Sequence, residues 1–198
     1  MKIQLRNLQV LKIFSTQRCQ PTRQGSPHRL LRLLAPGSKP LQICFRGYHG
    51  PEAEAFVEFE SFLARSRVAR FYTQDGFPPM RLLLHHAPHL ERVILDNFEC
   101  YERAKIPPSW LDVGDLSSLP RLKSLDVINS ILLEHQLRLM LECCPSGVTL
   151  YSSSVDCDNV KEDASITPEQ LLEAFPTLKS VEDGFPSKDP TADWDILD

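Results

Sequence analysis

The first quarter of the sequence lacks acidic residues. Residues 1–50 contain nine Lys and Arg side chains and no Asp or Glu. The rest of the chain then holds 13 basic and 26 acidic residues, although the net charge of the whole chain is only −4. An elongated protein with this charge distribution is expected to have a basic end and an acidic end.

Long apolar runs are also missing. No stretch of about 18 consecutive apolar residues occurs, so we expect no membrane span and no membrane partner. A composition of 42% hydrophobic and 24% charged residues is typical of globular proteins. A chain of 198 residues fits one domain of ordinary size.

None of the cysteines forms a CxxC pair, and no secretory signal with a compact apolar region is visible. These absences favour a reducing intracellular compartment, cytoplasmic or nuclear. We expect at least one of Cys143 and Cys144 to be a small buried apolar residue. The six cysteines are Cys19, Cys44, Cys100, Cys143, Cys144 and Cys157.

Signatures of catalysis are absent too. There is no GxGxxG, no GxxxxGK[ST] and no nucleophile elbow. Among His85, His86 and His89, only His85 and His89 have the spacing of two ligands on one helix face, Pro88 breaks the helix between them, and the glutamate of HExxH is missing. A metal-dependent hydrolase is therefore the third hypothesis, and the favoured interpretation is a protein that is no enzyme and holds no cofactor or metal.

Basic residues near the N-terminus do not alternate with aromatic residues as a single-stranded nucleic-acid platform requires. We therefore expect no nucleic-acid partner. The same acid-poor, Arg-rich and Ser-containing start is typical of mitochondrial transit peptides, which keeps a mitochondrial protein as an alternative.

What the sequence does contain is a recurring phrase, clearest in APHLERVIL at residues 87–95 and LPRLKSLDV at residues 119–127. In both, a proline is followed by apolar residues two, five and seven positions later. Seven such phrases follow one another with a mean spacing of about 28 residues, which is typical of leucine-rich repeats. They begin at Leu8, Leu41, Val68, Leu90, Leu122, Val148 and Leu178.

Each phrase alternates apolar and other residues as a short strand does. Segments with helical spacing precede five of the phrases, at residues 28–35, 55–66, 80–87, 132–144 and 167–175. The pattern predicts an α/β fold: a leucine-rich-repeat solenoid of about six to seven irregular repeats, with a curved parallel sheet on the concave side and helices on the convex side.

We expect one domain over residues 1–183, followed by an acidic flexible tail at 184–198. No helical segment precedes the phrase at Leu8, and nothing polar caps that end of the stack. Either the polar stretch at residues 17–29 folds back over this edge, or the domain is truncated at its N-terminal end as part of a longer protein, which is the interpretation we favour.

The residues between the core positions of each strand are predicted to line the concave side of the sheet, because alternate side chains of a strand face opposite ways. Several of them are aromatic, apolar or Arg, the types that carry binding energy at protein interfaces. The predicted protein-binding residues are Lys12, Phe14, Arg46, Arg70, Tyr72, Arg92, Ile94, Asp96, Asp126, Ile128 and Tyr151.

The phrase ECCPSGVTLYS at residues 142–152, together with APHLERVIL and LPRLKSLDV, resembles the irregular leucine-rich repeats of F-box proteins, particularly the fungal kind. The resemblance spans about residues 5–183. It implies a substrate-recognition region of a ubiquitin-ligase adaptor, in which a separate F-box binds the adaptor of a cullin-type ligase. No F-box is visible in this chain, and Phe98 and Ser130 stand where the family's repeats place an asparagine or cysteine.

The sequence thus favours a non-catalytic protein–protein interaction module. The first hypothesis is the substrate-recognition repeat region of an F-box-like protein, with an unknown client as its partner. The alternative is a mitochondrial leucine-rich-repeat assembly factor with an N-terminal targeting segment.

Overall fold

The structure is a computed structural model that describes residues 3–5, 7–14, 27–46, 53–74, 80–98, 122–156, 166–186 and 189–194. Within these ranges the chain alternates between short parallel strands and short helices. The helices are α1 (Pro27–Leu33), α2 (Ala53–Ala64), α3 (Met80–His86), α4 (Glu134–Cys143), α5 (Pro168–Ala174) and the 3-10 helix η3 (Ala192–Trp194).

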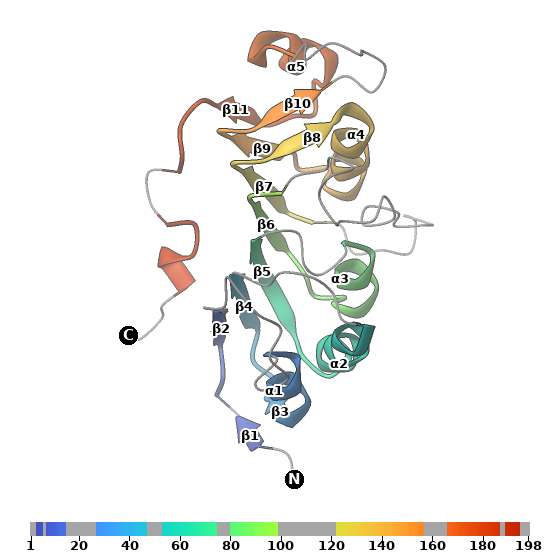
Figure 1. The fold of residues 1–198 in the computed structure, drawn as a ribbon, viewed down its shortest axis with the longest axis vertical. Coiled ribbons are helices and arrows are strands. Elements are labelled where there is room, and N and C mark those ends of the chain that lie inside the picture. Colours follow the sequence, from blue (N-terminus) through green and yellow to red (C-terminus); the bar gives the residue numbers. More distant parts are fainter. Residues whose placement is uncertain are drawn as a thin grey trace.

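Seven strands form one parallel sheet in the order β11-β9-β7-β6-β5-β4-β2, so that neighbours along the described chain are neighbours in the sheet (Figure 1). Two further sheets of two parallel strands lie beside it, β1 with β3 and β10 with β8. The strands of the large sheet are β2 (Val10–Phe14), β4 (Leu41–Arg46), β5 (Val68–Gln74), β6 (Arg92–Asp96), β7 (Ser124–Ile128), β9 (Val148–Tyr151) and β11 (Ser180–Glu182). The small sheets comprise β1 (Ile3–Leu5), β3 (Leu34–Pro36), β8 (Ile131–Leu133) and β10 (Ser154–Asp156).

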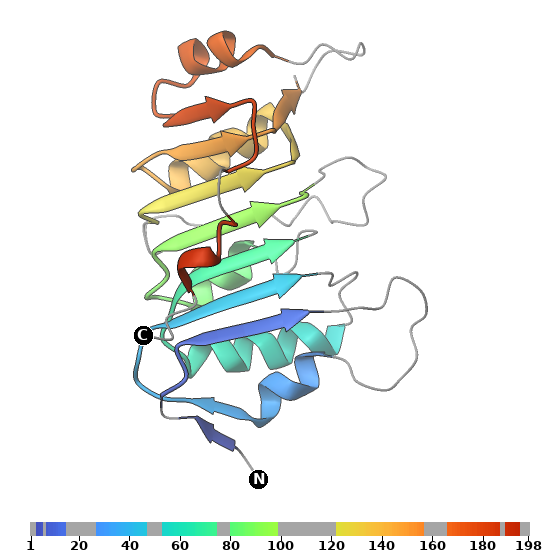
Figure 2. The ribbon, with the colours of Figure 1, turned by 90° about the vertical axis from the view of Figure 1, so that its left-hand side faces the viewer.

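Helices α1 to α4 cover one face of the large sheet, and the other face carries no such layer (Figure 1). We call the uncovered side the open face, defined by the strand residues that point away from the helices, such as Cys44, Tyr72 and Ile94. Figure 2 shows this face toward the viewer, with η3 in front of the strands.

The main core lies between the sheet and the helices. Its rows follow the strand register, in which Phe71 is aligned with Val93 and Val93 with Leu125. All three side chains are fully buried, so each strand contributes its apolar set to the same interior. The leucines that define the repeated phrase, Leu90 and Leu122, are buried there as well.

Helix α2 is held against the sheet by aromatic packing. The rings of Phe59 and Phe45 meet edge-on at 5.4 Å, and those of Phe59 and Phe71 at 5.8 Å. Arg65, just after the helix, donates hydrogen bonds to the carbonyl oxygens of Leu31 and Leu34. These carbonyls belong to the end of α1 and the start of β3, so one guanidinium ties two successive units together.

The structure has the α/β architecture and the parallel sheet that the sequence predicts. Each of the seven phrases contains one strand of the large sheet, and each predicted helical segment overlaps a helix, with α1 and α2 beginning one and two residues earlier than predicted. The predicted alignment fails at its last phrases, because Val148 is aligned with Leu125 and not with Leu122. None of the helices that the structure describes is both long and apolar enough to cross a bilayer.

The last described segment differs from the predicted flexible tail. Residues 189–194, which we call the tail segment, lie against the open face, and Trp194 is fully buried there. A single large aromatic side chain can hold a short polar segment in place, because its burial removes a large apolar area from water. Composition alone, dominated by acidic residues and prolines, does not reveal this anchor.

Candidate protein-binding face

The strand register brings the predicted binding residues together on the open face. One row runs across five strands, with Lys12 aligned with Cys44, Cys44 with Tyr72, Tyr72 with Ile94 and Ile94 with Asp126. A second row pairs Arg70 with Arg92, and a third pairs Asp96 with Ile128 and Ile128 with Tyr151. The predicted residues therefore form one continuous surface that crosses the sheet.

Arg92 and Asp126 form the strongest ion pair of this face. The Nε and Nη2 atoms of Arg92 lie 3.0 and 2.7 Å from Oδ2 of Asp126. Asp126 is only 7% exposed, so the pair is shielded from solvent on its acidic side. The Arg92 guanidinium already forms an ion pair within the same chain, and we infer that its main role is to position Asp126.

Tyr72 is the second polar anchor. Its hydroxyl donates a hydrogen bond to Oδ2 of Asp96 on the next strand. Burial, reinforced by this hydrogen bond to a carboxylate, raises the pKa of Tyr72 above its usual range. The phenol therefore stays protonated and keeps the Asp96 carboxylate oriented.

The open face is less exposed than the sequence suggests. Phe14 is 56% exposed, as predicted for a surface aromatic residue. Tyr72, Ile94 and Ile128 are buried in a cluster that also contains Cys44 and Trp194 of the tail segment. They lie on the predicted face, but they are not exposed on it.

Arg46 connects the face to the tail segment. Its Nη2 atom lies 2.9 Å from Oδ2 and 3.1 Å from Oδ1 of Asp189. The guanidinium carbon also lies 4.9 Å from the centre of the Tyr72 ring and 5.9 Å from that of Phe14. Arg46 therefore bridges an aromatic pair and a carboxylate, a combination that favours arginine over lysine.

Nothing in this arrangement provides a nucleophile. Burial raises the pKa of the Cys44 thiol despite the neighbouring Arg46 guanidinium, so the thiol is neutral. Catalytic cysteines have the opposite property, a lowered pKa in a partly exposed site.

Comparisons with protein-family models, curated proteins and solved structures find no match to this chain.

The turns after β6, β7 and β9 share one backbone conformation. Asn97, Asn129 and Ser152 have φ angles of 54°, 47° and 45°, in the left-handed region. Each N–H donates to the last strand residue of the following strand: Asn97 to Ile128, Asn129 to Tyr151 and Ser152 to Glu182. Asparagine tolerates this conformation better than most residues, which is the signal that the sequence offers at two of the three positions.

Serine hydroxyls continue the same edge. The Ser130 hydroxyl accepts a hydrogen bond from the N–H of Phe98 at 2.9 Å, and the Ser153 hydroxyl accepts one from the N–H of Ser130 at 3.1 Å. Ser130 stands where the F-box repeats have an asparagine or cysteine. Its hydroxyl accepts a hydrogen bond from the backbone of the preceding turn. Ser152 lies in the turn and not at a core position.

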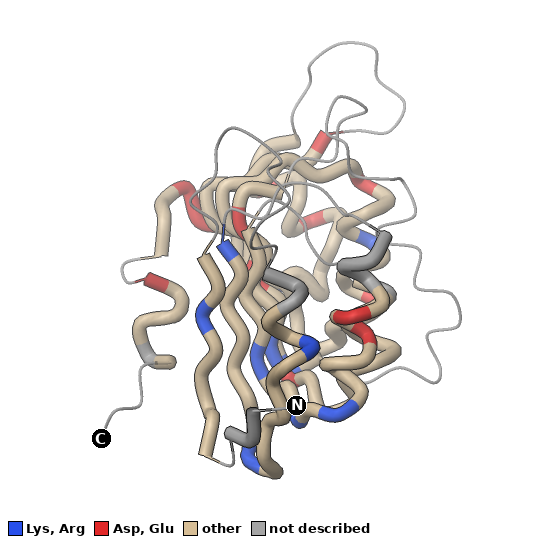
Figure 3. Tube along the Cα trace, turned by 60° about the horizontal axis from the view of Figure 1, so that its bottom comes forward, with Lys and Arg blue, Asp and Glu red and all other residues tan. Residues whose placement is uncertain are grey.

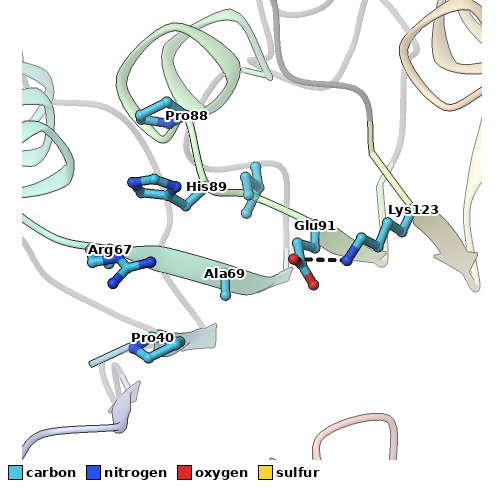
Figure 4. A pocket seen from close by; sticks show the side chains of 8 residues that line it. Pro40, Arg67, Ala69, Pro88, His89, Glu91 and Lys123 are labelled. Carbon is cyan, nitrogen blue, oxygen red and sulfur yellow. Dashed lines mark ion pairs between the residues drawn. The ribbon is translucent and has the colours of Figure 1, made fainter. Parts of the chain in front are cut away.

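A pocket of about 370 Å³ lies at the opposite edge, where strands β4 to β7 begin (Figure 4). Its charged groups neutralise each other in part, since Lys123 Nζ lies 2.8 Å from Glu91 Oε1. The Nη1 atom of Arg67 donates a hydrogen bond to the carbonyl oxygen of Ser38. His89 lines this pocket, but no buried polar group points into it, so it is a weaker candidate than the open face.

The histidine cluster does not assemble a metal site within the described residues. His86 Nε2 lies 3.9 Å from Glu60 Oε1 of helix α2, and the side chains of His85 and His89 are exposed. In the described ranges, no group of three His, Cys, Asp or Glu side chains could hold a metal ion. Cys19, Cys100 and Cys157 lie outside the described residues.

Charge is distributed unevenly over the sheet. Lys12, Arg46 and Arg70 belong to the early strands β2, β4 and β5, whereas Asp96 and Asp126 belong to β6 and β7. Figure 3 shows Lys and Arg positions on the strands nearest the N-terminal end of the stack. On β6 and β7 the acidic groups are already engaged, Asp126 by Arg92 and Asp96 by Tyr72, so the charge that distinguishes this face is the basic charge on the early strands.

Proposed function

We propose that the chain is an irregular leucine-rich-repeat solenoid that binds a protein partner on the open face of its sheet. The observation that carries the proposal is a second apolar cluster on that face, formed by Cys44, Tyr72, Ile94, Ile128 and Trp194 and separate from the helix-covered core. Trp194 of the tail segment covers part of it, and apolar surface on an open sheet commonly marks a place where another chain packs.

Several features support the solenoid. The strands of the large sheet follow chain order, the helices cover one face only, and successive turns repeat one left-handed conformation. Such units cannot bury their apolar strands alone and must stack. The Ser130 and Ser153 hydroxyls act as a short hydrogen-bonded ladder between units.

Within this class, the resemblance of the phrases favours the substrate-recognition region of an F-box-like ubiquitin-ligase adaptor. The place of β2 supports it over the mitochondrial alternative. Val10–Phe14 is aligned along its whole length with β4. Removal of the first 20 to 40 residues as a targeting segment would take away Ile13, which is buried in the main core, and would therefore leave that core incomplete.

The test is affinity capture from cells followed by mass spectrometry, with variants of open-face residues that lie outside the Trp194 cluster. Phe14→Asp and Arg70→Glu are expected to lower the recovery of the specific partner at least tenfold. Arg92 is not suitable for charge reversal, because a glutamate there would face the buried Asp126. The matched control is Val57→Asp, which places the same charge on a residue of α2 that is 64% exposed.

The proposal is contradicted if both face variants recover the partner as well as Val57→Asp does. The identity of the captured proteins decides the finer assignment. A cullin and its adaptor among them support the F-box-like interpretation, and their absence indicates a free-standing binding module.

A further inference from the structure

The tail segment already occupies part of the open face, so its chemistry indicates which kind of ligand this face binds. Trp194 is fully buried in a cluster with Cys44, Tyr72, Ile94 and Ile128, which come from four adjacent strands, and the partly buried Tyr151 packs against this cluster. The cluster is separate from the main core beneath the helices. It therefore acts as an aromatic site on the outside of the sheet.

The other end of the tail segment presents a carboxylate. Asp189 accepts hydrogen bonds from Arg46 and, through Oδ1, from the N–H and the hydroxyl of Thr191, both at 2.8 Å. The backbone continues this compact turn, since the N–H of Trp194 donates to the carbonyl oxygen of Thr191 at 3.0 Å. A carboxylate and an indole five residues apart thus bind two adjacent sites, one basic and one apolar.

The match between the tail segment and the face is incomplete. Among the described residues, three buried polar atoms have no hydrogen-bond partner: Gln42 Oε1, Arg46 Nε and Trp194 Nε1. Each such atom costs free energy that a better ligand would recover. The tail segment is favoured by its covalent attachment, which raises its local concentration, and not by a perfect fit.

We propose that the open face binds a short acidic segment of a partner protein in which a carboxylate precedes a tryptophan by about five residues, and that the tail segment is a resident copy of this ligand. Arg46 takes the carboxylate, and the cluster of Cys44, Tyr72, Ile94 and Ile128 takes the indole. The partner displaces Trp194 in order to bind. This inference rests on the proposed function and names the chemistry of the partner.

The probe is a fluorescent peptide with the sequence of residues 186–198, PSKDPTADWDILD, and the protein is the full chain. The Trp194→Ala chain is expected to bind the peptide at least tenfold more tightly than the wild-type chain, whose site is filled. A control peptide with alanine in place of the tryptophan should bind neither. Adding Arg46→Glu to the Trp194→Ala chain should weaken binding at least tenfold.

Cys44 reports directly whether the site is open. It lies beneath Trp194, whereas Cys144 is buried in the main core. In the Trp194→Ala chain, we expect alkylation of Cys44, measured by mass spectrometry, to rise at least tenfold while Cys144 stays protected. If both cysteines react, Trp194 is an integral part of the fold and not an exchangeable ligand, and the inference is wrong.

The remaining outcomes also decide the matter. A Trp194→Ala chain that ignores the peptide, or binds the alanine control equally well, overturns the inference while leaving the capture result for Phe14→Asp and Arg70→Glu to judge the proposed function. If the wild-type chain forms a dimer and the Trp194→Ala chain does not, the tail segment is bound to a second copy of the chain, which also overturns the inference. Capture that ignores the face variants refutes the proposed function itself, whatever the peptide does.

Discussion

Ser130 illustrates how single side chains hold the units of this sheet together. It is 2% exposed, its hydroxyl accepts the N–H of Phe98, and it donates to the carbonyl oxygen of Ile128 at 2.7 Å. The hydroxyl therefore satisfies one buried backbone donor and one acceptor in two adjacent turns. Because the turns precede and follow strands of the binding face, this bond also fixes the spacing of the residues on that face.

Ser130→Ala is expected to lower the free energy of unfolding by about 1–3 kcal/mol, since it leaves a buried N–H without an acceptor. The measurement is urea unfolding followed by circular dichroism. The matched control is Ser61→Ala on α2, where the exposed hydroxyl accepts a hydrogen bond from Arg65. That change should cost less than about 0.5 kcal/mol. Equal effects at the two serines would show that the Ser130 ladder carries no stability.

At the scale of elements, the turn between α4 and β9 depends on one glycine. Gly147 has a φ angle of 103°, and a Cβ atom placed there would lie 2.9 Å from Cβ of Lys179 and 3.2 Å from the carbonyl oxygen of Thr177. The following unit therefore packs directly on the backbone of this turn. Only glycine satisfies both the conformation and the close approach.

Gly147→Ala should destabilise the protein by about 1–3 kcal/mol, because strain and steric overlap add at one position. Gly184→Ala is the control, since a Cβ atom at Gly184 meets nothing within 4 Å. Thermal unfolding of both variants compares them directly. A melting temperature for Gly147→Ala that matches that of Gly184→Ala would mean that the β11 unit is not packed on this turn.

The elements themselves could be predicted because each is encoded locally. Alternating apolar residues such as Val93 and Leu95 specify strands, and segments such as 132–144 specify helices by their spacing. The alignment of the later units could not be read in the same way. Val148 looks like the first leucine of a phrase, yet the strand register makes it equivalent to Leu125, because β9 is short and its left-handed turn comes at Ser152.

The position of the open face could be predicted from the sequence, but the burial of its residues could not. Alternation along a strand places Tyr72, Ile94 and Ile128 on one side of the sheet without any knowledge of the fold. Their burial depends on Trp194, which lies 66 positions or more along the chain from them. Contacts of this kind are decided by tertiary packing, and neither composition nor periodicity in a tail of few apolar residues reports them.

The molecule as a whole consists of a layered scaffold and an open face that is partly filled by the tail segment. The helices cover one face of the sheet, and the tail segment lies on the other (Figures 1 and 2). Arg46 on β4 pairs with Asp189 of the tail segment, and Trp194 of the same segment joins the apolar cluster, so charge and apolar contact hold the segment together. Under the proposed function, a partner binds to this face only if it displaces the tail segment.

The most direct measurement is site-specific photocrosslinking in cells. A photoreactive phenylalanine analogue at Phe14, on the open face, should crosslink the partner found by affinity capture. The same analogue at Val57, equally accessible on the helical side, should give no crosslink to that partner. Crosslinks from position 57 in place of position 14 would contradict the central claim, because the partner would then be bound on the helices and not on the open face of the sheet.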